Sequence, residues 1–281
     1  MLPNLNSLIN KVKIPSIENL RGVAALSVCV FHLTANLHLF NEANFIRKVS
    51  NYGYLGVQIF FVISGFVIPF SLYQAKYKIK YLFSFLLKRF IRIEPPYVAS
   101  ILLIVFLNLL SSKFKLYNGP PFHFEIIQFL CHLVYLPEHF KYNWYQPVYF
   151  TLLIEFEFYI LLGLIYRLLT NSNGWVFCNF VIIVLLGSYL AKVELFAVID
   201  VFLIGIIYFK YKIGHLKMYE FIFFEASIIL FSGFDDPDIN VPIIETLTLF
   251  GLLFWDRSNL ATQFLGKISY SLYLIHIPIG G

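Results

Sequence analysis

Two ionisable residues stand inside the first apolar run of the chain, in the stretch ENLRGVAALSVCVFHL. Arg21 and His32 are eleven positions apart, so on a helix they share nearly the same face, about 16 Å apart along the axis. Ionisable side chains are costly in hydrocarbon, and those within a span are functional candidates by default. A neutral imidazole at His32 can act as a general base toward a hydroxyl group. The alternatives are a snorkelling anchor for Arg21 and an interhelical hydrogen bond for His32.

Two carboxylates stand inside a later apolar run, YFTLLIEFEFYILLGL, at Glu155 and Glu157. Side-chain packing does not explain two ionisable groups in such a place. One of them can orient a histidine or bind a sugar hydroxyl. A buried ion pair between helices is the alternative.

A basic cluster precedes another apolar run, in the stretch FLLKRFIRIEPPYV. Arg89 and Arg92 are three positions apart and share a helix face, with Lys88 beside them. A pair of forked guanidinium groups suits phosphate. The alternative is a topological cluster that touches anionic lipid, and this segment alone favours that interpretation.

Two further runs carry polar residues at helical spacing. Ser64 and Gly65 lie in the middle of GVQIFFVISGFVIPF, where they favour tight helix packing or, alternatively, a locally broken helix that lines a cavity. The last run, LGKISYSLYLIHIPI, holds Tyr270 and His276. Tyrosine is common at membrane interfaces, whereas the histidine is unusual there.

The composition is that of an integral membrane protein. Of 281 residues, 59% are hydrophobic and only 13% are charged, against about 25% in ordinary soluble domains. No basic cluster alternates with aromatic residues in a groove-like pattern, which argues against nucleic-acid binding. The cysteines, Cys29, Cys131 and Cys178, stand singly, so neither a disulfide framework nor a metal site is indicated.

Nine apolar runs approach the length that a transmembrane helix needs. We therefore expect an all-α, polytopic transmembrane helical bundle of about nine to ten spans. The short segment 124–137 is expected to be re-entrant or interfacial. The runs are 22–40, 54–74, 93–111, 147–168, 175–191, 194–209, 219–233, 240–255 and 262–279.

The distribution of basic residues predicts the orientation. With nine spans and a cytoplasmic N-terminus, fifteen of the 21 Lys and Arg residues face the cytoplasm. This is the asymmetry that the positive-inside rule requires. The chain is thus expected to be a multi-pass protein of the cell (cytoplasmic) membrane, with segment 75–92 inside and segment 112–146 outside.

The order of these motifs resembles the acyltransferase-3 family of multi-pass membrane acyltransferases. LRGVAALSVCVFH, GVQIFFVISGFVI, RFIRIEPPY, FTLLIEFEFY and LGKISYSLYLIHIPI follow one another over about residues 16–279. The resemblance implies transfer of an acyl group, commonly acetyl, from cytoplasmic acyl-CoA to a hydroxyl of a cell-surface or exported carbohydrate. It implies the lipid bilayer, acyl-CoA and a carbohydrate or glycolipid acceptor as partners.

The resemblance also assigns roles. His32, Arg21 and Glu155 would be catalytic, with His32 as base or as covalent carrier of the acyl group. It implies acyl-CoA (acetyl-CoA) as co-substrate and neither a permanently bound cofactor nor a metal. The acyl-CoA site would comprise Arg89, Arg92 and Lys88, and the cavity would be lined by Ser64, Gly65, Glu157, Tyr270 and His276.

The chain departs from the family pattern at three places. Phe150-Thr151 replaces the usual Trp-Ser before Glu155, and Gln58 stands where Asp is common. Relatives usually continue through another helix beyond the position of Gly281. We expect a single membrane domain over 1–281 that is short of this helix. A glycolipid or polysaccharide transporter or flippase, and a truncated non-catalytic relative, stay open as alternatives.

Overall fold

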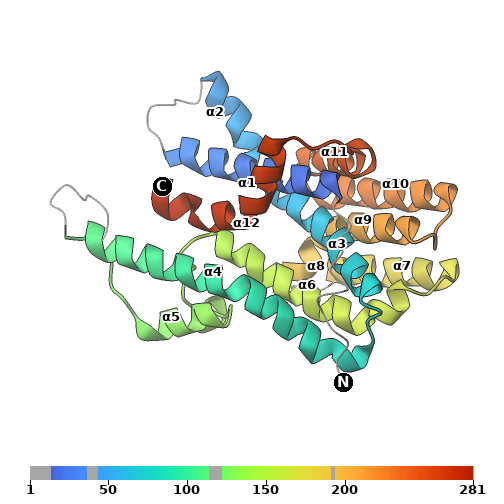
Figure 1. Ribbon diagram of the computed structural model, residues 1–281, viewed down its shortest axis with the longest axis horizontal. Helices are drawn as coiled ribbons and strands as arrows, with labels where there is room; N and C mark the ends of the chain where they lie inside the picture. Colours follow the sequence, from blue (N-terminus) through green and yellow to red (C-terminus); the bar gives the residue numbers. More distant parts are fainter. Residues whose placement is uncertain (1–13, 37–43, 114–121, 191–193, 281) are drawn as a thin grey trace.

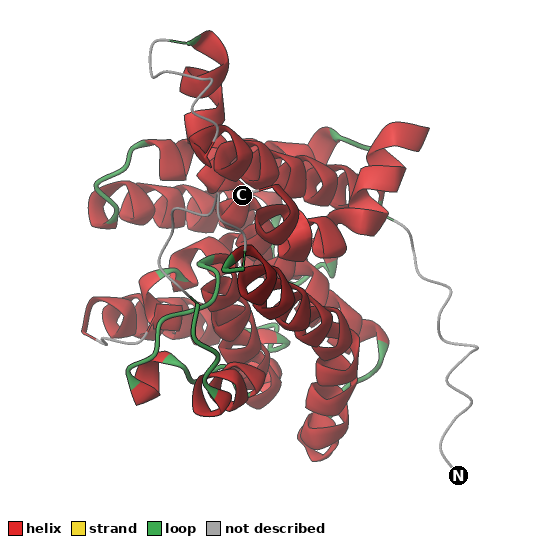
Figure 2. Cartoon of the chain, turned by 90° about the vertical axis from the view of Figure 1, so that its left-hand side faces the viewer, coloured by secondary structure: helices red, strands yellow, loops and turns green. Residues whose placement is uncertain are grey.

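The computed structural model describes residues 14–36, 44–113, 122–190 and 194–280. Within these ranges the chain forms helices and turns but no strand (Figure 2). The elements are α1 (Pro15–Asn36), α2 (Phe45–Ser50), η2 (Asn51–Leu55), α3 (Gly56–Gln74), η3 (Ile79–Tyr81), α4 (Leu82–Ser111), α5 (Ile126–Leu133), η4 (Glu138–Phe140), α6 (Val148–Leu169), α7 (Gly174–Leu190), α8 (Glu194–Ala197), α9 (Ile199–Lys212), α10 (Met218–Asp235), α11 (Asn240–Phe254) and α12 (Leu260–Gly280).

Over the described residues each of the nine apolar runs coincides with helical structure, and the short segment 124–137 contains α5. Residues 37–40 of the first run and residue 191 of the fifth lie outside the described residues. In the described ranges, three helical stretches are long and apolar enough to cross a membrane: Phe45–Gln74, Ile79–Ser111 and Val148–Leu169. Two shorter stretches, Gly174–Ser188 and Asn240–Phe254, are also apolar. The all-helical fold is confirmed, and the count of nine crossings stays a prediction.

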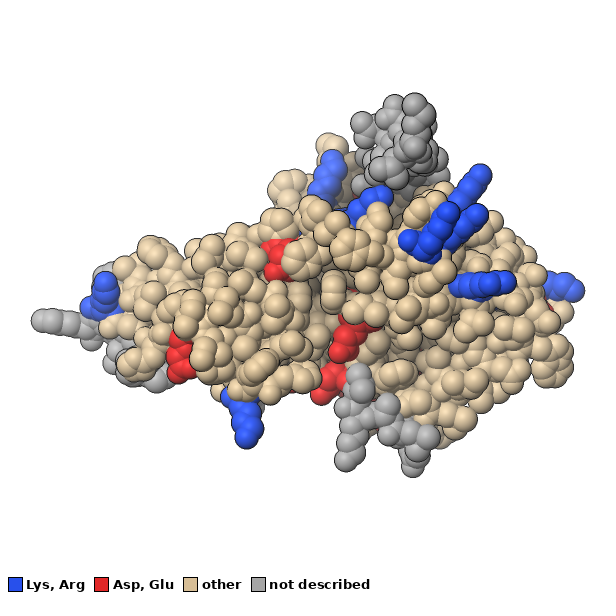
Figure 3. Space-filling model, turned by 90° about the horizontal axis from the view of Figure 1, so that it is seen from below, with Lys and Arg blue, Asp and Glu red and all other residues tan. Residues whose placement is uncertain are grey.

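Large apolar side chains cover much of the outside. Phe106, Ile183 and Phe234 are 61%, 67% and 90% exposed, respectively. Figure 3 shows a face that is mostly neither basic nor acidic, with several Lys and Arg side chains gathered toward one end. Such a surface suits hydrocarbon rather than water, which identifies a membrane protein.

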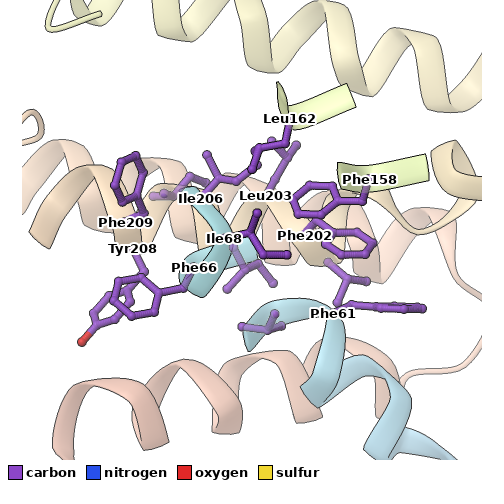
Figure 4. Close-up of a cluster of buried hydrophobic side chains, with 14 of the residues drawn as sticks. Phe61, Phe66, Ile68, Phe158, Leu162, Phe202, Leu203, Ile206, Tyr208 and Phe209 are labelled. Carbon is purple, nitrogen blue, oxygen red and sulfur yellow. The ribbon is translucent and has the colours of Figure 1, made fainter. Parts of the chain in front are cut away.

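The main core lies where α3 crosses α9. Aromatic rings from α3, α6 and α9 stack there, with Phe202 packed between Phe61 and Phe158 at centroid distances of 4.8 and 4.0 Å (Figure 4). The two helix backbones touch through glycines. A Cβ on Gly65 would lie 2.1 Å from the carbonyl oxygen of Phe202, and one on Gly205 would lie 2.1 Å from that of Val62. Small residues thus set the distance between the helices.

This contact predicts a strong effect for Gly65→Ala. Because the added methyl group meets backbone rather than a movable side chain, we expect a loss at the upper end of about 1–3 kcal/mol. Thermal unfolding in detergent measures it. Gly233→Ala is the matched control, since its Cβ would meet nothing closer than Pro242 at 3.8 Å. Equal melting temperatures for the two variants would contradict the packing described here.

Helix α4 differs from the sequence expectation. The sequence predicts a span that begins near residue 93, after a basic loop, whereas α4 begins at Leu82 and contains Pro95 and Pro96. Lys and Arg are good helix formers, so the basic segment continues the helix. Proline leaves the carbonyl four residues earlier without its helical donor. The carbonyls so affected are those of Ile91 and Arg92. In the same turn the hydroxyl of Tyr270 donates to the carbonyl of Ile93, at 2.8 Å.

Helices α1 and α12, from opposite ends of the chain, lie side by side (Figure 1). Glycines again permit the contact. A Cβ on Gly266 would lie 2.4 Å from the carbonyl oxygen of Glu18, and one on Gly22 would lie 2.9 Å from the Cβ of Leu265. This pairing places the polar residues of α12 beside Arg21 and His32.

Candidate active site

A cavity of about 140 Å³ lies among α1, α3, α4, α6 and α12. Its walls combine aliphatic and aromatic groups with a compact set of polar side chains. Among the described residues that line it, three are arginines, and a single carboxylate faces them. The polar and tyrosine lining residues are Arg21, Ser64, Arg89, Arg92, Thr151, Glu155, Tyr159, Tyr270 and Tyr273.

The three arginines reach the cavity from two helices. Arg21 is half-buried on α1, and its Nε is buried without a hydrogen-bond partner among the described residues. Arg89 donates to the hydroxyl of Ser71 at 2.8 Å and lies over the ring of Tyr159, 5.5 Å from its centroid. Arg92 is exposed at the edge of the cavity. Three guanidinium groups against one carboxylate leave an excess of positive charge that suits an anionic ligand.

The carboxylate of Glu155 is held by hydroxyl groups. It accepts a hydrogen bond from Tyr159, four residues later on α6, and one from Ser64 on α3 at 3.4 Å. On the same side, Thr151 and Tyr273 exchange a hydrogen bond of 2.8 Å between their hydroxyls, which joins α6 to α12. These bonds fix the orientation of the polar groups that face the cavity.

His32 lies beyond the cavity, further along α1. Its ring is 5.2 Å from that of His276, centroid to centroid, and 4.9 Å from that of Phe31. The ring of Tyr273, which lines the cavity, is 6.0 Å from that of His276. A continuous row of aromatic rings therefore runs from the cavity through Tyr273 and His276 to His32.

Of the predicted cavity residues, Ser64 and Tyr270 line the cavity, whereas Gly65, Glu157 and His276 do not. Gly65 packs against the backbone of α9 instead. Helix α3 is continuous at this residue, so the alternative prediction of a locally broken helix is wrong. Glu157 is two positions from Glu155 and so lies on another face of α6. Lys88 is exposed and does not line the cavity, unlike its neighbour Arg89.

Three polar residues that line the cavity, Thr151, Tyr159 and Tyr273, were assigned no role from the sequence. Tyr159 follows Glu155 by four residues, and this helical spacing is the signal that could have identified it. Tyr273 stands three residues before His276 in the same way. Thr151 was noted only as a departure from the family pattern, and its hydrogen bond could not be predicted because the partner, Tyr273, belongs to a distant helix.

Three buried carboxyl groups, Asp200, Glu225 and Glu245, lie in a second polar region formed by α9, α10 and α11. Ser232 donates to Glu245 at 3.1 Å, while both oxygens of Glu225 are buried without a partner among the described residues. The region is separate from the cavity.

We expect Glu225→Gln to raise the melting temperature by a few degrees. A buried carboxyl group without partners is costly, because it must either stay charged in an apolar surrounding or take up a proton, and glutamine keeps its shape without this cost. Thermal unfolding in detergent tests this, with the exposed Asp256→Asn as control. A clear fall in melting temperature for Glu225→Gln alone would mean that the charge is paired in the folded protein.

The fold and the cavity together define a helical membrane protein with a cation-rich polar cavity among its helices. Residues 14–255 match the family model Acyl_transf_3, described as an acyltransferase domain. The chain therefore belongs to this acyltransferase family, which confirms the resemblance of its motifs. Helix α12, with Tyr270 and His276, lies beyond the matched residues. No curated protein and no solved structure matches the chain.

Proposed function

We propose that this protein is an O-acyltransferase that moves an acyl group, acetyl in chemical class, from cytoplasmic acyl-CoA to a hydroxyl of a cell-surface or exported carbohydrate. It would act as a multi-pass protein of the cytoplasmic membrane with about nine spans and a cytoplasmic N-terminus. The family membership and the apolar helices support this proposal.

The convergence of Arg21, Arg89 and Arg92 on one cavity is the observation that carries the proposal. Guanidinium groups bind phosphate oxygens in a fork, and the phosphates of acyl-CoA supply several such oxygens. A cavity of about 140 Å³ is small beside the roughly 300–1,000 Å³ of typical ligand sites. We therefore place the pantetheine arm of the donor inside it, the phosphates near the exposed Arg92 and the thioester at the Tyr273 end of the cavity, toward His32.

The chemical step would transfer the acyl group from the sulfur atom of CoA to the oxygen atom of the acceptor hydroxyl. The acceptor hydroxyl attacks the thioester carbonyl, the C–S bond breaks, and CoA leaves as the thiol. His32 either takes the hydroxyl proton as general base and passes it to the thiolate, or carries the acyl group on its ring before the hydroxyl attacks. Arg21 would stabilise the oxyanion that forms at the carbonyl, and Glu155 would orient a neighbouring group.

Mass spectrometry of surface glycans from cells with and without the gene tests the proposal. We expect the loss of an acetyl or a larger acyl substituent when the gene is removed. In parallel, the purified protein in detergent should bind acetyl-CoA, measured by equilibrium dialysis. Unchanged glycans together with no acetyl-CoA binding would overturn the proposal and favour a glycolipid transporter or a non-catalytic relative.

A further inference from the structure

We infer that His276 is a positioning residue that holds the imidazole of His32 in one tautomer and one orientation. This inference rests on the proposed function, in which His32 is the reacting histidine. The two residues come from the two ends of the chain, and the packing of α1 against α12 brings their rings to 5.2 Å, at an angle of 41°.

The hydrogen bonds of His276 fix where its proton lies. Its Nδ1 is 2.8 Å from the carbonyl oxygen of Tyr273 and 3.2 Å from that of Leu272. A carbonyl oxygen only accepts, so Nδ1 must carry the hydrogen. Nε2 of the neutral ring then holds the lone pair and is a hydrogen-bond acceptor.

This acceptor is buried and has no partner among the described residues. His276 is 4% exposed, so water does not readily satisfy the atom. An unpaired buried acceptor is unfavourable, and the adjacent imidazole of His32 can supply a donor. The two rings do not form a hydrogen bond in the structure itself. A bond of about 3 Å between ring nitrogens would separate the ring centres by about 5 Å, so the observed 5.2 Å lets a rotation of the His32 ring form it.

The consequence for His32 is a defined tautomer. When one ring nitrogen of His32 donates to Nε2 of His276, the other nitrogen presents its lone pair. That lone pair can take the proton of the carbohydrate hydroxyl or attack the thioester, so the defined tautomer favours both roles proposed for His32. A hydrogen-bond partner on one ring nitrogen thus selects which nitrogen reacts, as it does for histidines that bind metals.

The test compares three variants of His276 in the full-length protein. We expect His276→Phe, which keeps an aromatic ring, to lower kcat by about 10- to 100-fold while KM for acetyl-CoA stays within twofold. In His276→Gln the side-chain amide reaches the position of Nε2, so kcat should be at least tenfold higher than in His276→Phe. In His276→Asn the amide reaches only the place of Nδ1, and little rescue is expected.

A second readout is independent of activity. Nitrogen-15 NMR of protein with labelled histidine reports the tautomer of His32, assigned by loss of its signals in His32→Ala. We expect one dominant tautomer in the wild type and a mixture in His276→Phe. If kcat and the tautomer are unchanged in His276→Phe, the inference is overturned. If the wild type transfers no acyl group but its tautomer depends on His276, only the proposed function fails.

Discussion

Acyl transfer by His32→Ala is expected to fall by about 10²- to 10⁴-fold, because this range is typical of the loss of a general base. A covalent carrier would be at least as sensitive, since no intermediate could form. The side chain lies outside the cavity that holds the three arginines, so acetyl-CoA binding should change little. Transfer to the carbohydrate acceptor in membranes measures the first effect, and dialysis with acetyl-CoA measures the second.

The exposed His123 provides the matched control, because His123→Ala also removes one imidazole. It should retain the wild-type rate. Full activity of His32→Ala at normal protein levels would rule out both roles proposed for this residue. A loss of protein from the membrane would instead indicate a structural role, which thermal unfolding of the purified variant distinguishes.

Replacing Arg92 with alanine should raise KM for acetyl-CoA by about 10- to 100-fold with a smaller change in kcat. A hydrogen bond to a charged group contributes about 1.5–3 kcal/mol, and each 1.4 kcal/mol is a factor of ten. Arg92 suits this test better than Arg89, since Arg89 also bonds to Ser71 and packs over Tyr159. Steady-state kinetics at varied acetyl-CoA concentration gives both constants.

The control for this variant is Arg167→Ala, which removes an exposed arginine near the end of α6. Any general effect of lowering the positive charge of the protein should be shared by the two variants. An identical, small change of KM in both would contradict a phosphate contact at Arg92. A selective rise for Arg92→Ala that shrinks at high salt would match a charged contact.

The sequence predicted the positions of the helices well. In a bilayer every backbone N–H and C=O group must be hydrogen-bonded within the protein, so a long apolar run forms a helix. The sequence placed the start of the span in α4 near residue 93, after a basic loop, whereas α4 begins at Leu82. Lysine and arginine side chains do not prevent a helix, and the polarity of a segment does not mark its end.

The cavity was harder to predict than the helices. Arg89 and Arg92 are neighbours on one helix turn, so their shared face followed from spacing. Arg21 and Glu155 line the same cavity because of the way in which α1, α4 and α6 pack. The spacing of residues within a single helix does not predict this packing. The same holds for His32 and His276, whose proximity follows from the contact of the first and last described helices.

The glycine contact between α3 and α9 also constrains how this protein can diverge. Gly65 and Gly205 each lie against the backbone of the other helix, so neither position accepts a side chain unless the helices separate. A change at one cannot be compensated by a change at the other. Ser64, the immediate neighbour, faces the cavity instead. Natural variation in acceptor or acyl preference should therefore accumulate at cavity positions, while the pair of glycines is inherited unchanged.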